Sequence, residues 1–180
     1  MRIIAGEWRG RQVIVPAGLA TRPTSDRARE GLLSMLVSRL GTFEGLQVAD
    51  LFAGSGALGL EALSRGAAHC LFVDKERAAI DAIKANVAAL GANDRAEIRQ
   101  QAADYAMPPA RPCDLIFMDP PYGSGLAERT LAMIAHEEWL GDGALVSVEC
   151  ESEALAVPDG LKREAYRRFG RAHVHVLRRG

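Results

Sequence analysis

The sequence predicts a doubly wound α/β domain, in which helices cover both faces of a mostly parallel sheet. From residue 46 onward, short apolar runs alternate with longer segments of helical periodicity, and short connections join them. Such strand–helix–strand units form right-handed crossovers between parallel strands, and a sheet built this way is buried on both faces. We expect strands at 47–52, 69–74, 97–100, 114–119 and 144–149.

The two flanks of the chain read differently from its centre. Residues 2–15 hold two apolar pieces joined through Gly6 and Gly10, which predicts a small β-hairpin outside the main sheet. Either Thr24 or Ser25 fits as the N-cap of a following leucine-rich helix. Near the other end, "KREAYRRF" and "HVHVLRR" are separated by Gly170, and we expect them to form an antiparallel pair that closes the sheet.

Length and composition favour one domain over residues 1–180, with residues 1–24 as an N-terminal extension. The chain is 48% hydrophobic over its 180 residues, enough for one sizeable core. It has no secretory signal and no apolar stretch of the roughly 20 residues that a membrane span needs. The three cysteines are far apart, and His173 and His175 lack a third ligand nearby. We therefore expect a cytoplasmic monomer without membrane contact, disulfide or metal site.

Charge is concentrated at the two ends of the chain. Residues 1–40 carry seven arginines against three acids, a net charge of +4, and residues 161–180 carry seven basic residues against one acid, a net charge of +6. Since the whole chain has a net charge of −1, the centre has −11. Basic ends suit a polyanion such as RNA if they fold onto one face, and a merely solvated basic surface is the alternative.

A glycine-rich turn lies between the first expected core strand and the next helix. In "DLFAGSGALGLEAL", residues 50–63, glycines permit backbone conformations and close approaches that a side chain would block. The helix that follows points free N–H groups at whatever occupies the turn. Glycine turns also occur in dinucleotide domains and as plain tight turns. The candidate cofactor residues here are Phe52, Ala53, Gly54, Ser55 and Gly56.

Acidic residues at successive strand ends restrict which class of ligand this turn can bind. Asp50 leads the turn, where a carboxylate repels a pyrophosphate and attracts an ammonium group. Asp74 ends the next strand, at the distance where an acid receives ribose hydroxyls. Asp104 follows the third strand and can accept a hydrogen bond from the adenine amine, although a simple turn or cap carboxylate is the alternative. Together these acids favour S-adenosylmethionine over NAD.

The tetrapeptide Asp119, Pro120, Pro121 and Tyr122 follows the fourth strand. Ligands bind at this edge of open α/β sheets. The prolines end the strand and fix φ, so a rigid carbonyl can stand beside the Asp119 carboxylate. Two such acceptors match the two N–H bonds of an exocyclic amine on a nucleobase. Tyr122 offers a stacking surface for a base taken out of its helix or loop.

These motifs carry a resemblance to a known family. "DLFAGSGALGLEAL", "VDKE", Asp104 and "DPPY", in this order, resemble Rossmann-like class I methyltransferases that methylate amino groups. "IIAGEWRGRQVIVP", "TRPTSDRAREGLLSML" and "DLIFMDPPY" are more closely similar to the RsmD family of rRNA (guanine-N2)-methyltransferases. The resemblance covers about residues 2–150. It implies a seven-stranded Rossmann-like fold, S-adenosylmethionine as cofactor, and one guanine of 16S rRNA in the small ribosomal subunit as the target.

The resemblance also suggests roles for residues outside the main motifs. Arg22, Thr24 and Arg27 lie in "TRPTSDRARE", which in relatives borders the active-site mouth, so they are candidates for closing over the cofactor or contacting RNA. Thr24 has a purely structural cap as its alternative. We count Arg9 and Arg11 as further RNA candidates.

The residues around the ribose acid depart from the family pattern. Many relatives carry Glu where this chain has Asp74, and the shorter side chain would need a water or Glu76 to reach both ribose hydroxyls. Lys75, directly after Asp74, completes the candidate cofactor residues.

Two alternative functions stay open at this stage. A DNA adenine or cytosine amino-methyltransferase would share the chemistry, but such enzymes usually carry an added target-recognition region, for which this chain has no spare residues. A non-catalytic RNA-binding assembly factor could keep the fold and the cofactor site. The presence of both the glycine turn and the Asp-Pro-Pro-Tyr segment argues against it, because binding alone would not require both.

Overall fold

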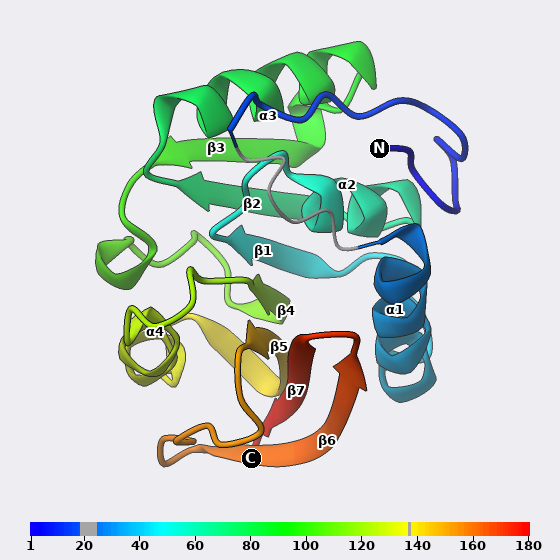
Figure 1. Cartoon of the computed structure of the whole chain (residues 1–180). Coiled ribbons are helices and arrows are strands. Elements are labelled where there is room, and N and C mark those ends of the chain that lie inside the picture. Colours follow the sequence, from blue (N-terminus) through cyan, green and yellow to red (C-terminus); the bar gives the residue numbers. More distant parts are fainter. Residues whose placement is uncertain (19–24, 137) are drawn as a thin grey trace.

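The strands form one seven-stranded sheet in the order β3-β2-β1-β4-β5-β7-β6 in the computed structural model, which describes residues 1–18, 25–136 and 138–180 (Figure 1). The strands are β1 Gln47–Leu51, β2 His69–Asp74, β3 Ala96–Gln100, β4 Cys113–Met118, β5 Leu140–Cys150, β6 Leu161–Phe169 and β7 Ala172–Arg179. The helices are α1 Asp26–Leu40, α2 Ala57–Ser64, α3 Arg77–Ala89 and α4 Leu126–Ile134, with 3-10 turns η1 Asn93–Arg95 and η2 Ala103–Tyr105.

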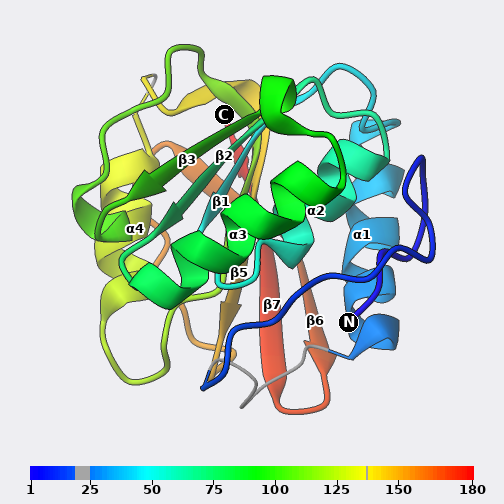
Figure 2. The ribbon, with the colours of Figure 1, turned by 90° about the horizontal axis from the view of Figure 1, so that it is seen from above.

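Strand directions confirm the predicted, mostly parallel sheet. Strands β1 to β5 pair in parallel, β7 runs antiparallel to β5, and β6 runs antiparallel to β7. The expected antiparallel pair at the end of the chain is therefore also confirmed. β6 runs in the same direction as β5, so the turn from β6 to β7 lies at the edge where the parallel strands end, the carboxyl edge (Figure 2).

β5 is longer than the apolar run from which it was predicted. It begins at Leu140 rather than near residue 144, because its first residues also pair with β4, across a register shift between Cys113 and Leu115. Gly141 and Gly143 interrupt the apolar pattern there, so the sequence alone does not mark this part as a strand. Pairing geometry, rather than side-chain pattern, sets where β5 starts.

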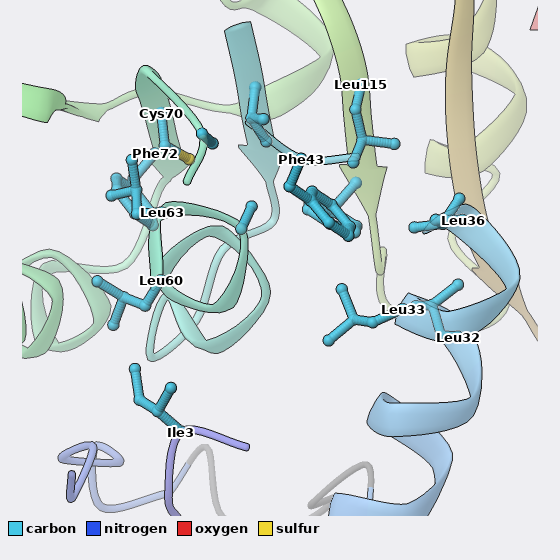
Figure 3. Packing of buried hydrophobic residues seen from close by; sticks show 14 of the residues in the cluster. Ile3, Leu32, Leu33, Leu36, Phe43, Leu60, Leu63, Cys70, Phe72 and Leu115 are labelled. Carbon is cyan, nitrogen blue, oxygen red and sulfur yellow. The ribbon is translucent and has the colours of Figure 1, made fainter. Parts of the chain in front are cut away.

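Helices on both faces bury most residues of the central strands. Along β1, Val48 belongs to the apolar cluster under α1, α2 and α3, and its neighbour Ala49 belongs to the cluster under α4. This alternation follows from the two-residue period of a strand. Figure 3 shows leucines of α1 and α2 in the first cluster, with Phe43 between the two helices. No helix in the described part of the chain is long and apolar enough to cross a membrane.

The N-terminal extension is a hairpin-like loop held on α2 rather than a regular ladder. A single antiparallel bridge, between Arg2 and Gln12, closes it. Its middle finds partners elsewhere: the N–H of Glu7 donates to the Ser64 carbonyl at 2.8 Å, and the N–H of Trp8 donates to the Ser64 hydroxyl at 3.0 Å. The end of α2 therefore satisfies backbone groups that a longer hairpin would pair between its own strands.

α1 begins where one of the two predicted caps stands. Ser25 is the N-cap, and its hydroxyl accepts a hydrogen bond from the N–H of Ala28 at 3.1 Å. This is the usual way in which a serine satisfies a free amide in the first helical turn. The other candidate, Thr24, lies outside the described residues.

A buried ion pair joins α1 to α2. Arg29 is 2% exposed and Glu61 is 1% exposed, and the Arg29 Nε lies 3.6 Å from the Glu61 carboxylate. Arg29 also donates to the backbone carbonyl of Arg2, and Glu61 accepts from the N–H of Ile4. One pair of charges thus fixes α1, α2 and the N-terminal extension relative to one another. Losing Glu61 would leave the buried Arg29 charge with only the exposed carboxylate of Asp26, 3.2 Å away, as its ionic partner.

We predict that Glu61→Ala lowers the free energy of unfolding by about 3–5 kcal/mol, the cost of breaking a buried pair from one side. Asp81→Ala is the matched control, because Asp81 pairs with Arg77 on the surface at 3.1 Å and both side chains are more than half exposed. Its expected effect is within about 0.5 kcal/mol. Equilibrium unfolding in urea measures both, and equal losses in the two variants would contradict a special role for the buried pair.

Candidate active site at the carboxyl edge of the sheet

Strand register brings the acidic motifs into one row at the carboxyl edge. Leu51 of β1 pairs with the β2 residue before Asp74 and with the β4 residue before Asp119. That β4 residue in turn pairs with the β5 residue before Glu149. One residue further along, the row across the edge is Asp74, Phe52, Asp119 and Glu149. The predicted glycine turn and the predicted catalytic segment therefore follow adjacent strands.

The glycine turn adopts backbone conformations of the kind that its glycines were predicted to permit. Gly54 has φ +59° and Gly56 has φ +81°, which favours glycine at both positions. Phe52 has φ +62°, and among the described residues it is the one non-glycine residue with positive φ. Such a conformation is uncommon for a bulky side chain and often marks a functional site. The N–H of Ala53 donates to the Val73 carbonyl at 3.0 Å and ties the turn to β2.

Two of the predicted acids hold the turn through its backbone. Asp74 accepts the N–H of Gly54 at 2.9 Å on one carboxylate oxygen and the N–H of Glu76 at 2.9 Å on the other. Asp50 is 3% exposed and accepts the N–H of Gly59, in α2, at 3.0 Å. Each Asp74 oxygen has a second lone pair, so two hydroxyl groups can still bind to this carboxylate. Asp50 holds the first turn of α2, directly after the glycine turn.

The electrostatics of the row favour a cationic ligand. Burial raises the pKa of Asp50 well above the usual 3.8, the hydrogen bond from Gly59 opposes this, and the negative charges of Asp119 and Asp74 raise the pKa further. Three carboxyl groups therefore sense one another at the ends of β1, β2 and β4. A bound cation would relieve their repulsion, whereas a pyrophosphate would add to it.

Asp104 lies on η2 and pairs with a residue that the sequence did not single out. The Nε and Nη2 atoms of Arg129, on α4, each lie 3.3 Å from one Asp104 oxygen. The Asp104 side chain is 9% exposed, and η2 has no side-chain cap, so this carboxylate is not the cap of its own turn. Arg129 also reaches the Ser124 carbonyl at 3.4 Å and thereby links Asp104 to the segment after Tyr122.

The Asp-Pro-Pro-Tyr segment leaves β4 with its polar groups at the surface. Asp119 is exposed and Pro120 is buried, so the Pro120 ring anchors the segment where it leaves the strand. The Tyr122 hydroxyl lies 3.4 Å from a carboxylate oxygen of Glu149. Glu149 was not among the predicted residues, although a charged residue at the end of an apolar strand in "ALVSVEC" was a usable signal.

Asn86 is a second residue that sequence reasoning missed. Although it lies on α3, it is 2% exposed, and its side-chain amide donates to the carbonyls of Ser55 and Ile14 at 3.0 Å each. Its oxygen accepts the N–H of Ile14 at 2.8 Å. The side chain thus joins the glycine turn to the N-terminal extension. Its sequence signal was only a polar residue at a helix position that should face the core.

The predicted basic residues do not all meet at this edge. Arg27 lines a groove beside Tyr122. Arg11 donates to the Ala89 carbonyl at the end of α3, and Arg9 follows a loop seated on the end of α2, so both lie toward the opposite edge of the sheet. Arg22 falls outside the described residues. Lys75 is 64% exposed and lies next to Glu76.

The site has room and acceptors for a nucleoside that carries positive charge. A side-chain carbon built on Gly54 would meet nothing within 4 Å, so open space lies directly against the turn. Asp74 offers acceptors for ribose hydroxyls, and Asp104 has an oxygen outside its Arg129 contacts for an amine. The glycine turn and an Asp-Pro-Pro-Tyr segment at adjacent strand ends of a sheet in this order define a Rossmann-like methyltransferase.

Comparison with known proteins identifies the family. The chain belongs to the family described as Conserved hypothetical protein 95, which it matches over residues 1–178. It is 40% identical over 153 residues to ribosomal RNA small subunit methyltransferase D of Escherichia coli K12, covering 85% of this chain and 76% of that protein. The Haemophilus influenzae protein of the same name is 38% identical over 157 residues, covering 85% and 80%. The resemblance to the RsmD family is confirmed.

A solved structure supports the same assignment. The E. coli protein yhhF is 37% identical to this chain and superposes with a TM-score of 0.87, covering 99% of this chain and 97% of the other. The likeness therefore includes the N-terminal extension and the closing antiparallel pair as well as the parallel strands. An enzyme of this class requires a methyl donor.

The two glycines of the turn allow a matched test of the ligand space. Positive φ costs an alanine about 1–2 kcal/mol at either position, and Gly56→Ala should lose a further ~1–3 kcal/mol by overpacking, because its new carbon would lie 3.2 Å from Phe72 and 3.3 Å from Ile83. Gly54→Ala should therefore be more stable than Gly56→Ala. It should nevertheless bind the methyl donor at least tenfold more weakly than the wild-type protein does. Thermal unfolding and calorimetry measure the two effects, and full donor affinity in Gly54→Ala would place the ligand elsewhere.

Proposed function

We propose that this protein transfers a methyl group from S-adenosylmethionine to the exocyclic N2 amine of one guanine in 16S rRNA. The observation that carries the proposal is the placement of Asp119-Pro-Pro-Tyr beside the glycine turn, at the ends of the adjacent strands β4 and β1. The names of its relatives support rRNA as the substrate. The choice of guanine and of its N2 atom rests on the resemblance to the RsmD family.

The cofactor residues suit S-adenosylmethionine one group at a time. Asp74 would accept the ribose hydroxyls, Asp104 the adenine amine, and the backbone from Phe52 to Gly56 would border the methionine part. The carboxylates of Asp74 and Asp119 complement the ammonium and sulfonium groups, and a bound cation would oppose the rise in the pKa of Asp50. When bound, the cofactor supplies an electrophilic methyl group on a positively charged sulfur.

Asp119 and the carbonyl of Asp119 or Pro120 would position the target amine. An amine conjugated to a nucleobase is a weak nucleophile. Accepting both of its hydrogens favours a more tetrahedral nitrogen, whose lone pair can face the methyl group. Transfer would form an N–C bond at this nitrogen and break the C–S bond of the bound cofactor, and the nitrogen would then lose one proton. Because Asp119 is exposed, that proton has a path to solvent. Catalysis here is mainly positioning and electrostatics.

Tyr122 would hold the guanine after it leaves its stack. Tyr122 follows Asp119 after two prolines in the chain, and its hydroxyl is close to Glu149, which restrains the ring orientation. Stacking of a base on an aromatic side chain contributes about 1–3 kcal/mol. This contribution offsets part of the cost of unstacking the target base.

The setting of the reaction follows from its substrate. We propose a cytoplasmic monomer that acts on the small ribosomal subunit or on an assembly intermediate. The curated relatives are named as methyltransferases of ribosomal RNA, which favours rRNA over DNA as the substrate. An exposed Asp119 beside an open glycine turn also favours catalysis over a purely structural assembly role.

Transfer of a labelled methyl group from S-adenosylmethionine to four substrates tests the proposal. The substrates are small ribosomal subunits from a strain that lacks the enzyme, their naked rRNA, duplex DNA and free nucleosides. We expect label in subunits or rRNA that digests to N2-methylguanosine. Label confined to DNA would refute the proposed substrate, and cofactor binding without transfer to any substrate would favour the assembly-factor alternative.

In the same assay we predict that Asp119→Ala reduces kcat by at least about 10², the scale of lost transition-state positioning. The exposed position of Asp119 means that the fold should tolerate the change. Cofactor affinity, measured by calorimetry, should stay within a few fold of wild type. Unchanged turnover would show that the amine is held by other groups.

Asp50→Asn separates stability from cofactor binding. Because the folded-state pKa of Asp50 is raised, its contribution to stability is greatest below its unfolded pKa and is lost as pH rises through the folded pKa. Asparagine keeps an oxygen for the Gly59 N–H and removes the charge, so the variant should melt at or above the wild-type temperature at pH 7–8. Its affinity for S-adenosylmethionine should fall about tenfold. A lower melting temperature with unchanged affinity would contradict this role.

A further inference from the structure

A groove runs from the proposed catalytic segment to the β6–β7 turn. It has a volume of about 870 Å³ and lies between the first turns of α1 and the end of the sheet. Tyr122 and Glu149 line it on the side of the catalytic row, which is the row Asp74, Phe52, Asp119 and Glu149 at the carboxyl edge. Residues 167–172 line it on the other side. Figure 2 shows the β6–β7 turn at the edge where β5 ends, with α1 alongside. The groove is therefore continuous with the site where the target base would sit.

Close packing between α1 and β6 shapes one wall of the groove. A side-chain carbon on Gly31 would lie 2.7 Å from the ring of Phe169, so only glycine lets the end of β6 approach α1 this closely. The tight turn after Phe169 uses Gly170, which has φ +61°. The wall is thus a built feature of the fold, held by an aromatic ring against a helix.

The charge of the groove is mainly positive. Arg27, Arg167, Arg168 and Arg171 line it and are exposed, against Glu30 and Glu149. Two of the guanidinium groups are held at the turn: Arg167 lies over the Phe169 ring, 5.1 Å from its centre, and Arg168 donates to the Gly170 carbonyl at 2.8 Å. Arginines restrained in this way lose less side-chain entropy when they bind a phosphate.

The carboxylate of Glu149 marks where a phosphate would not lie. Glu149 sits at the inner end, beside Tyr122, and would repel a phosphate there. A carboxylate accepts hydrogen bonds, and the Watson–Crick edge of guanine presents an N–H beside its amine. A strand whose backbone follows the arginines, with one base turned toward Tyr122 and Glu149, satisfies both ends of the groove.

We propose that this groove binds the RNA strand that flanks the target guanine, with Arg167, Arg168 and Arg171 of the β6–β7 turn contacting its phosphates. The inference rests on the proposed rRNA methyltransferase function and adds the path of the substrate. It also explains how the basic C-terminal part of the chain comes to serve the active site: β6 runs parallel to β5, which brings its end to the catalytic edge.

A triple variant, Arg167→Ala, Arg168→Ala and Arg171→Ala, tests the groove. The matched control is Lys84→Ala, Arg111→Ala and Lys162→Ala, which removes the same charge from exposed positions on α3, before β4 and at the start of β6. Binding of naked 16S rRNA is measured across salt concentrations, together with kcat/KM for methyl transfer to unmethylated subunits. Melting temperature and S-adenosylmethionine affinity report on the fold and the cofactor site.

We expect the groove variant to bind rRNA at least tenfold more weakly, with a salt slope reduced by about 2, as three lost single-strand phosphate contacts imply. The control should stay within about twofold of wild type, and both should keep cofactor affinity. Equal losses of rRNA affinity in both triple variants would overturn the proposed role of the groove. Unchanged rRNA binding in the groove variant, or a fall in its melting temperature that parallels the loss of binding, would do the same. If wild-type protein itself transfers no methyl to rRNA, the proposed function fails instead.

Discussion

The hydrogen bonds from the glycine turn and the start of α2 to two buried or half-buried carboxylates organise the rest of this site. Asp74 accepts the amide of Gly54, and Asp50 accepts the amide of Gly59. These bonds hold a backbone that Phe52 strains through its positive φ. Placing these acids together has an electrostatic cost, because burial and the neighbouring acids raise the pKa of Asp50. A ligand with positive charge relieves this cost, so the groups that shape the turn also select what it binds.

Parallel pairing makes this arrangement possible. In a parallel sheet every strand ends at the same edge, and beyond the register shift near the start of β4 the pairing across β2, β1, β4 and β5 aligns the residues at that edge. Four segments far apart in the sequence therefore contribute to one row. The antiparallel β6–β7 pair adds its turn to the same edge, since β6 repeats the direction of β5. The groove and the catalytic row are consequences of the same strand order.

The parts outside the sheet are tied to the site by buried polar contacts. Asn86 connects the glycine turn to the N-terminal extension, and the Arg29–Glu61 pair connects that extension to α1 and α2. α1 in turn forms a wall of the groove through the contact of Gly31 with Phe169. Polar contacts of this kind have narrow geometric requirements, so they fix the position of α1 beside the catalytic row more closely than apolar packing would. The described part of the N-terminal extension therefore supports the glycine turn through Asn86 and the groove through α1.

The sequence by itself determined the element order, the parallel sheet with its closing pair, and the three strand-end motifs. Local signals carry these features: a two-residue or helical period, a glycine turn, and prolines after an apolar strand. Only the tertiary structure decided which distant residues meet. The pairing of Asp104 with Arg129, the bridge made by Asn86, and the approach of Glu149 to Tyr122 each join residues at least 25 positions apart. Tertiary placement likewise brought Arg27 to the groove and set Arg9 and Arg11 toward the opposite edge, although all three look alike in the sequence. Charge and residue type are local properties of a chain, whereas the partner of a side chain depends on how strands and helices pack, and no local pattern encodes that.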